Sequence, residues 1–411
     1  MDKPEQTAGE ARADVVIAGG GLVGLTLGVA LASAGLEVAV VDAEPPEAMR
    51  ARAFDGRVSS IALGSKRMLD AIGVWHRLEA VAEPILEIRV SDGEALLFLH
   101  YDHELVGPEP LGFIVENRET RTALLDEAAE CSSLRHLTPA RVASLAPEPG
   151  SITATLDDGR TLRASLAVVA EGRDSPLRAA AGIGTVAWRY PQVGIVCTVA
   201  HERPHRGIAH ERFLPAGPFA ILPMTGNRSS LVWTERDSLA PALMALPEPA
   251  FHDEMARRFG DFLGKLEVVG PRWSYPLALS HARRYAAERL ALVGDSAHAI
   301  HPIAGQGFNL GLRDVAALAE LIVDRHRLGL DIGTRDLLAG YERQRRFDTL
   351  ALIAVTDGLN RLFSNDVAPV VLARDLGLAA VNRIRPLKRL FMRHAMGTLG
   401  DLPRLARGEK L

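Results

Sequence analysis

The sequence predicts an α/β protein: a discontinuous Rossmann-like domain, interrupted by a β-rich second domain and closed by a helical C-terminal region. Three observations predict this architecture. The chain opens with an apolar strand, a glycine-rich turn, a helix of small residues and a second apolar strand. From about residue 183 to 280 most segments have strand character, punctuated by Pro and Gly. Helical patterns dominate the C-terminal part. We expect a disordered leader at 1–13, the Rossmann-like domain at 14–75, 113–182 and 281–340, the β-rich domain at 76–112 and 183–280, and the helical region at 341–411.

Composition is that of an ordinary globular protein. The 411 residues suffice for two or three packed units, with 47% hydrophobic and 24% charged residues. A net charge of −4 gives no general attraction to nucleic acid, so no nucleic-acid partner is expected. Two cysteines cannot form a disulfide framework, and the polar N-terminal segment lacks the apolar core of a signal peptide. No apolar run approaches the roughly 18 residues that cross a bilayer, so we expect a cytoplasmic protein.

The N-terminal βαβ unit carries a nucleotide-binding pattern. The strand Asp14–Gly19 leads into Gly19-x-Gly21-x-x-Gly24 and the helix Leu22–Gly35, and the strand Leu36–Asp42 then ends in an acid. Glycines at these positions permit a tight turn, close approach of a pyrophosphate and close packing of helix on strand. The carboxylate of Asp42 can accept hydrogen bonds from ribose hydroxyls. One bound dinucleotide is therefore expected, and this motif leaves NAD and FAD open.

The middle of the chain alternates between helices and hairpins. Helical patterns are expected at Ser59–Trp75, at Glu116–Glu130 and near 248–263. Hairpins are expected around the turns Asp92-Gly93 and Asp158-Gly159, because Asp-Gly between alternating segments favours a tight turn.

A second pattern, "ALVGDSAHAIHPIAGQGFNLGLRDVAAL" at Ala291–Leu318, could serve a metal, a nucleophile or a cofactor. A metal site would need a third ligand beside His298 and His301, and only Asp295 is near, so no metal is expected. Ser296 does not lie in a G-x-S-x-G elbow, which argues against a nucleophile.

The loop inside this stretch has little side-chain material. A plain strand–loop–helix connection would not need glycine at Gly305, Gly307 and Gly311. A bare backbone at a helix start instead suits a planar or anionic ligand that lies against the amides. The pattern therefore favours a cofactor.

The order of these motifs resembles the single-component (class A) flavin-dependent aromatic hydroxylases, and within them the ubiquinone-biosynthesis hydroxylase family. The resemblance extends from residue 14 to about 397. It rests on the glycine fingerprint with Asp42, on "LAVVAEGRDSPLR" at Leu166–Arg178 and on the Gly294-Asp295 stretch. The segments "DGRVSSIALGSKRMLDAIGVW", "IVENRETRTALL", "AHERFLPAGPFAILPM" and "YERQRR" also match. The resemblance implies that the dinucleotide is FAD, held in a Rossmann-like FAD-binding domain.

The resemblance also implies which residues contact FAD. The fingerprint and Asp42 would bind the ADP half, Asp295 the ribityl chain, and the loop from Pro302 to Asn309 the flavin ring. Glu171 stands where the family usually has aspartate. The implied cofactor-binding residues are Gly19, Gly21, Gly24, Asp42, Arg57, Arg118, Glu171, Gly172, Gly294, Asp295, Pro302, Gly305, Gln306, Gly307, Phe308 and Asn309.

The activity that the family implies is hydroxylation of the aromatic ring of a polyprenylphenol or ubiquinone precursor. NAD(P)H or another electron donor would reduce FAD, and O2 would form a flavin C4a-hydroperoxide whose distal oxygen attacks the ring. The candidate catalytic residues are Pro302, at the wall between flavin and substrate, and His210, near the substrate. Two alternatives remain. One is another flavoenzyme of this fold, such as a hydroxylase of a soluble aromatic, a prenyl reductase or a halogenase. The other is a non-catalytic FAD-bound subunit of a quinone-biosynthesis complex.

The C-terminal segment predicts an amphipathic helix. In "PLKRLFMRHAM", Pro386–Met396, one helical face carries Leu387, Leu390, Phe391 and Ala395, beside three basic residues. This pattern suits a helix on the inner face of a membrane, where anionic lipid attracts basic residues. It suits equally a helix that packs in a core or binds a partner, for example in a quinone-biosynthesis complex. A lipophilic substrate would make membrane contact through 386–411 useful.

Overall fold

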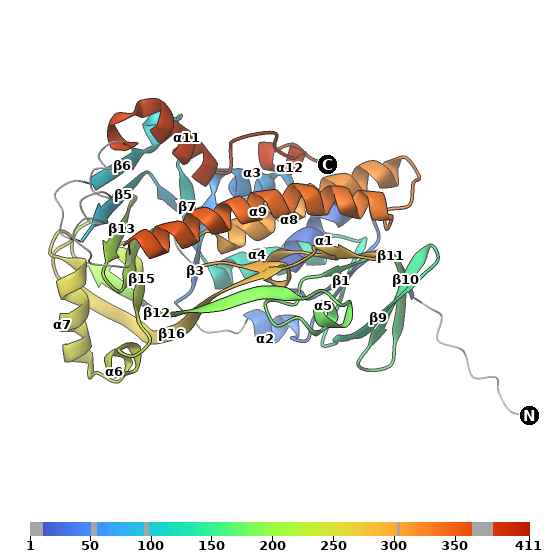
Figure 1. The fold of residues 1–411 in the computed structure, drawn as a ribbon, viewed down its shortest axis with the longest axis horizontal. Coiled ribbons are helices and arrows are strands. Elements are labelled where there is room, and N and C mark those ends of the chain that lie inside the picture. The colour runs from blue at the N-terminus through green and yellow to red at the C-terminus, as the bar shows by residue number, and fades with distance from the viewer. Residues whose placement is uncertain (1–10, 51–55, 94–97, 302–304, 364–380) are drawn as a thin grey trace, which may run out of the picture.

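The computed structural model describes residues 11–50, 56–93, 98–301, 305–363 and 381–411. Two eight-stranded sheets lie side by side, and the long helix α9 (Arg335–Phe363) runs across both of them (Figure 1). The α/β architecture predicted from the sequence is confirmed.

The first sheet forms the domain that the resemblance predicts to bind FAD, called the FAD-type domain below. Its order is β17-β18-β11-β1-β2-β8, and the hairpin β9–β10 extends it from β11. Parallel neighbours pair with both edges of β1, and packing on both faces buries its residues from Val15 to Ala18 in the main core. The strands are β1 (Ala11–Ala18), β2 (Val38–Val41), β8 (Leu134–Leu137), β9 (Val142–Glu148), β10 (Ser151–Leu156), β11 (Thr161–Val169), β17 (Ala286–Ala287) and β18 (Leu290–Leu292), and the helices are α1 (Leu22–Ser33), α2 (Pro46–Arg50), α4 (Asn117–Glu130) and α5 (Pro176–Ala180).

Two expectations about this domain are wrong in detail. Residues Ala11–Ala13, expected in a leader, pair with Leu162–Ala164, because backbone hydrogen bonds extend a strand beyond its apolar core. The segment Ser59–Trp75, expected to be helical throughout, begins as a strand. Its first residues belong to β3 (Val58–Ala62), which pairs with β7 (Gly112–Glu116), and only then does α3 (Leu63–Ala71) follow. A third strand, β4 (Glu83–Ile85), completes this small sheet.

The second sheet forms the β-rich domain, with the order β19-β16-β12-β15-β14-β13-β5-β6. Both predicted hairpins are present. The strands β5 and β6, on either side of Asp92-Gly93, pair in this sheet, and β10 and β11, on either side of Asp158-Gly159, pair in the first. The strands are β5 (Glu87–Asp92), β6 (Phe98–Asp102), β12 (Thr185–His201), β13 (Ile208–Leu214), β14 (Gly217–Met224), β15 (Arg228–Arg236), β16 (Leu266–Ala282) and β19 (His298–Ala299), and the helices are α6 (Ala240–Met244) and α7 (Glu248–Phe259).

The two faces of this second sheet have different partners. The outer face carries Phe219 and Trp233, which form a buried core with Phe251 of α7. The inner face carries residues such as Ala209, which packs with Leu63 of α3 and with α11 (Arg385–Ala395). The inner face therefore looks toward the FAD-type domain, and the outer face is closed by the domain's own helices.

The C-terminal helices bind the domains together. Helix α8 (Gln306–Arg327) packs on α1 and α9, and α12 (Arg404–Arg407) packs on α3 and α8. The helical region begins at Arg335, before the expected boundary. Among the described helices, none combines the length and apolarity that a membrane span requires.

Candidate active site

Three glycines shape the turn between β1 and α1. Gly19 has a φ of +107°, and a Cβ there would lie 2.4 Å from the carbonyl oxygen of Ala170, so only glycine fits. A Cβ on Gly24 would lie 1.9 Å from the carbonyl oxygen of Gly19, because α1 packs directly on the turn. Gly21, the N-cap of α1, faces open space. The turn is thus closed on the protein side and open at the helix N-terminus, where an anion can approach the amides.

Asp42 follows β2 and faces this turn. Its carboxylate accepts hydrogen bonds from the N–H of Gly20 at 2.5 Å and of Glu44 at 2.8 Å. His136 of β8 lies beside it, because β8 pairs with β2. Its buried Nε2 has no hydrogen-bond partner in the part of the chain that the structure describes. Burial lowers the pKa of His136 despite the charge of Asp42, so a neutral ring borders the turn. No sequence motif marks this histidine.

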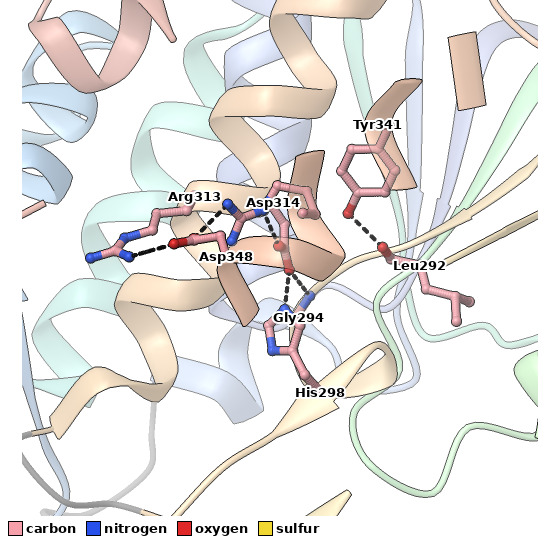
Figure 2. A network of polar contacts seen from close by, with 8 residues as sticks. Leu292, Gly294, His298, Arg313, Asp314, Tyr341 and Asp348 are labelled. Carbon is pink, nitrogen blue, oxygen red and sulfur yellow. Dashed lines mark hydrogen bonds and ion pairs between the residues drawn. The ribbon is translucent and has the colours of Figure 1, made fainter. Parts of the chain in front are cut away.

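The Gly294-Asp295 turn is held by a buried carboxylate of α8, Asp314 (Figure 2). Asp314 is 0% exposed and accepts hydrogen bonds from Gly294 N–H at 3.0 Å, His298 Nε2 at 2.6 Å and Arg345 Nε at 2.8 Å. Burial opposes ionisation, but the charges and hydrogen bonds of His298 and Arg345 hold the pKa of Asp314 below its ordinary value. This network was not predicted from the sequence.

Helix α9 extends the network outward (Figure 2). Arg345 also donates to Asp348 at 2.7 Å, and Arg313 of α8 reaches Asp348 at 3.4 Å. The hydroxyl of Tyr341 donates to the carbonyl of Leu292 at 2.7 Å, at the end of β18. The "YERQRR" segment therefore fixes both the strand before the turn and the carboxylate beneath it.

Asp295 differs from its neighbours. Its side chain is exposed, whereas Gly294 and Ser296 are buried. Its carboxylate makes no hydrogen bond to the described residues. The surrounding protein nevertheless raises the pKa of Asp295 by burial, against the opposing charges of His298 and Arg173. An accessible carboxylate in surroundings that disfavour its charge suits a ligand with hydroxyl groups.

The start of α8 is fastened to β3. Gly305, its N-cap, has a φ of +61°, and a Cβ there would lie 2.9 Å from the Ser60 side chain. The Asn309 side chain donates to the carbonyl of Ser60 at 2.7 Å and accepts from the N–H of Ala62 at 2.9 Å. Gly307 has open space beside it. The first turn of α8 therefore presents bare backbone in a fixed position.

Other residues of this stretch have separate roles. A Cβ on Gly311 would lie 2.7 Å from Val23, so this glycine serves the packing of α8 on α1 rather than a ligand. Gln306 is buried, and Phe308 packs against the main core. Pro302, predicted to be catalytic and to contact the cofactor, lies outside the described residues.

The motif at Leu166–Arg178 is hydrogen-bonded to the Gly294-Asp295 turn. Glu171 accepts hydrogen bonds from Ser175 Oγ at 2.7 Å and Leu177 N–H at 3.3 Å, so its carboxylate caps α5. Gly172 has a φ of +90°, and its carbonyl accepts from Ser296 Oγ at 3.1 Å. Ser296 is therefore a structural hydroxyl that links the two motifs.

Both predicted arginines lie at the edge of the small sheet. Arg57 is exposed directly before β3, and its carbonyl accepts from the N–H of Asn117 at 3.0 Å. Arg118, in the first turn of α4, forms an ion pair with Glu116 at 2.7 Å. Contact of either arginine with a cofactor remains a prediction.

His210, the other predicted catalytic residue, lies on the outer face of β13. Its ring centroid is 4.7 Å from that of Phe262, and burial together with Arg89 and Arg212 lowers the pKa of His210 to about 4. Alternation along the strand turns His210 away from the FAD-type domain. The expectation that His210 lies near the substrate is therefore not supported by its position.

The histidines of the Gly294 stretch have other partners than a metal. His298 binds Asp314, and the ring of His301 packs edge-on against Tyr190 with centroids 5.1 Å apart. Within the described ranges, no three His, Cys, Asp or Glu side chains converge as metal ligands.

Comparison with known proteins decides the family. A family model described as an FAD binding domain matches residues 12–352. UbiL of Rhodospirillum rubrum, a ubiquinone hydroxylase, is 57% identical over 97% of this chain and 94% of its own length. The 3-demethoxyubiquinol 3-hydroxylase of Escherichia coli is 33% identical over 93% of this chain and 98% of its own. The chain belongs to the class A flavin-dependent aromatic hydroxylases, in the ubiquinone-biosynthesis family. The p-nitrophenol 4-monooxygenase PnpA of Pseudomonas putida shares the fold, with a TM-score of 0.77 at 18% identity over 94% of this chain and 98% of that one.

The hydroxylase binds FAD, uses O2 and needs a reductant, and the geometry fits this cofactor. The open helix N-terminus at Gly21, the oriented carboxylate of Asp42, the accessible carboxylate of Asp295 and the bare backbone from Gly305 to Gly307 lie in the same domain. We call these four features the cofactor site.

Replacing Asp295 by alanine is expected to weaken FAD binding without weakening the fold. Loss of a charge-assisted hydrogen bond costs about 1.5–3 kcal/mol, or roughly 10- to 150-fold in Kd. Because the raised pKa means that ionised Asp295 destabilises the folded apoprotein at neutral pH, the Tm of the apo variant should not fall. Flavin titration and thermal denaturation measure both effects. Asp261→Ala, at an exposed aspartate of the other domain, is the control. Stoichiometric, tightly bound FAD in Asp295→Ala would contradict the assignment.

Asp314→Asn is expected to destabilise the fold by about 3–5 kcal/mol, because it removes the fully buried one of the two carboxylates that pair with Arg345, and with it the negative charge that His298 and Gly294 contact. The lowered pKa of Asp314 means that its contribution is present above the ordinary aspartate pKa and is lost as pH falls through the folded value. The variant should therefore lose less stability than the wild type on acidification. Denaturant unfolding across pH tests this. Asp324→Asn, which removes an exposed ion pair of the same helix, should cost less than about 1 kcal/mol; equal losses in the two variants would refute a special role for Asp314.

Proposed function

We propose that this hydroxylase adds oxygen to the aromatic ring of a polyprenylated phenol, a precursor of ubiquinone. The identity of 57% to a ubiquinone hydroxylase over 97% of the chain carries this proposal. The inner face of the β-rich sheet is in keeping with it, because that face carries apolar side chains and is turned toward the FAD-binding domain.

The assignment of FAD contacts belongs to the same proposal. The pyrophosphate would lie at the N-terminus of α1 beside Gly21, and the adenosine ribose would bind Asp42, with His136 next to it. Asp295 would accept hydrogen bonds from the ribityl hydroxyls. The flavin ring would lie against the first turn of α8, whose N-terminal dipole favours negative charge by about 1 kcal/mol or less.

FAD supplies the activation of O2 and the transfer of one oxygen atom to the ring. The protein's share is to hold the ring, exclude water and place the cofactor. Leu222 and Met224 of β14 pack in one apolar cluster with Met392 of α11 and with Met396, the residue that follows this helix. Flexible methionine side chains adapt to irregular apolar shapes, which suits an isoprenoid chain. The cluster would therefore guide the lipid tail past α11.

Helix α11 would bring this region to a membrane surface. Its Leu390 and Phe391 are 47% and 45% exposed, so the apolar face does not pack in the core. Arg385, Lys388 and Arg389 line a hollow of about 360 Å³ beside β6, where an anionic headgroup could bind. Of these three, Lys388 is buried, whereas Arg385 and Arg389 are exposed. Exposed arginines beside exposed apolar side chains on one short helix are typical of a helix that lies in the interface.

Within the segment 386–411, the proposed membrane contact is limited to α11, because α12 packs against the rest of the protein. Leu405 of α12 is buried in the main core, and Arg404 pairs with Glu320 of α8 at 2.9 Å. Residues 404–407 are therefore held against the protein.

The activity has a direct test. FAD-loaded protein with NADH or NADPH, an ortho-polyprenylphenol and isotopically labelled O2 is expected to yield a product with one labelled ring oxygen, detected by mass spectrometry. The Asp295→Ala variant without bound FAD serves as the negative control. Oxidation of the donor with release of hydrogen peroxide but no labelled product would contradict the proposal, and faster hydroxylation of phenols without a chain would contradict its lipophilic substrate.

Substitution of both Leu390 and Phe391 by aspartate should reduce co-sedimentation with anionic liposomes at least about tenfold, because it removes two apolar anchors and adds repulsive charge. Leu328→Asp, at a 73% exposed leucine after α8, is the matched control. Equal binding by the double variant and the wild type would show that α11 is not the membrane contact.

A further inference from the structure

The inner face of the β-rich sheet carries one carboxylate among apolar neighbours, Glu211 of β13. Along the strand, Ala209 packs with Leu63 of α3, and Phe213 stacks on Phe363 of α9 with ring centroids 4.1 Å apart. Because side chains alternate along a strand, Glu211 points to the same face as these two residues. It therefore lies on the face of the sheet that is turned toward the FAD-binding domain, opposite in direction to His210.

The strands on either side give this carboxylate no partner. Its cross-strand neighbours are Val90 of β5 and Ala220 of β14. Glu211 makes no hydrogen bond or ion pair within the part of the chain that the structure describes, and its side chain is half-buried. A carboxylate in such surroundings is costly unless a ligand supplies a donor.

The strands and helices around this face carry several charged residues. Asp92 is the last residue of β5 and Arg228 the first of β15. On α9, Asp357 is paired with Arg361, and on α11, Lys388 donates to Asn382. None of these charges affects Glu211 as strongly as burial does, and burial raises the pKa of Glu211 to about 7.

We propose that Glu211 is the hydrogen-bond acceptor and general base for the phenolic hydroxyl of the substrate. This inference rests on the proposed function, since it requires a phenolic ring between the sheet and the cofactor site. The O–H bond of the phenol breaks, the proton passes to a carboxylate oxygen of Glu211, and the electron pair stays on the phenolate oxygen. The phenolate is more electron-rich than the phenol, so the ring is a better acceptor of an electrophilic oxygen atom. A base is most effective when its pKa lies near the working pH.

The test compares Glu211→Gln with the wild type, both loaded with FAD. Glu235→Gln is the matched control, because Glu235 lies on the outer face of the same sheet, 4% exposed and 3.6 Å from Arg258. Calorimetry measures the affinity for ortho-octylphenol and for its methyl ether, well above and well below the pKa of Glu211. In the wild type and in Glu235→Gln, the phenol should bind about tenfold or more tightly than the ether at high pH, and this preference should shrink at low pH as Glu211 is protonated. In Glu211→Gln the preference should be small and independent of pH.

Two further measurements separate chemistry from structure. The acidic limb of the pH profile of kcat/KM, near 7 in the wild type, should be absent in Glu211→Gln. The raised pKa means that ionised Glu211 destabilises the folded protein above that pH, so the apo variant should have a higher Tm than the wild type at high pH and a similar Tm at low pH.

The outcomes distinguish this inference from the proposed function. If the wild type prefers phenol to ether and Glu211→Gln keeps the same preference and pH profile, the role of Glu211 is refuted and the proposed function stands. If the wild type shows no preference at any pH and hydroxylates no phenol, the phenolic substrate is refuted, and the role of Glu211 with it.

Discussion

The arrangement of this molecule depends on the buried carboxylate of Asp314. Its two oxygen atoms bind the amide of Gly294, the ring of His298 and the guanidinium of Arg345. Gly294 follows a strand of the first sheet, His298 lies in the edge strand of the second, and Arg345 belongs to α9. A buried carboxylate remains ionised only when donors and cations surround it. Moving any of these partners away would leave the buried charge of Asp314 unpaired. The network therefore holds both sheets and two helices in one relative position.

The cofactor site follows from that position. With α8 fixed at Asp314, its first turn reaches β3, where Asn309 binds Ser60 and Ala62. The inner face of the second sheet then lies across from this turn, since Trp273 of β16 contacts Gly56 just before β3. In the proposed site, the first turn of α8 and the apolar face of the sheet would form the two walls around cofactor and substrate.

Local signals in the sequence predicted most of the elements and a bound dinucleotide, and the family resemblance identified that dinucleotide as FAD. Pairing over long distances determined the rest. The glycine turn at Gly19–Gly24 and the Asp-Gly hairpins are local, so their geometry could be predicted. Asp314 lies in an ordinary helical pattern, and His136 reaches Asp42 only through the pairing of β8 with β2. His210 was predicted to lie near the substrate, but neighbouring residues on a strand point to opposite faces. Only the register of β13 against β14 and β5 places His210 on the outer face.

Three carboxylates differ in whether the protein itself supplies their partners. Protein cations satisfy Asp314, and its pKa is lowered; no described residue pairs with Asp295 or Glu211, and their pKa values are raised. Asp314 therefore stabilises the folded chain, while Asp295 and Glu211 destabilise it when they are ionised. Ligands that bind only the folded state stabilise it by mass action. If FAD binds Asp295 and the phenolic substrate binds Glu211, as proposed, each ligand would offset the cost of one unpaired carboxylate, and the complex with both ligands would be the most stable form.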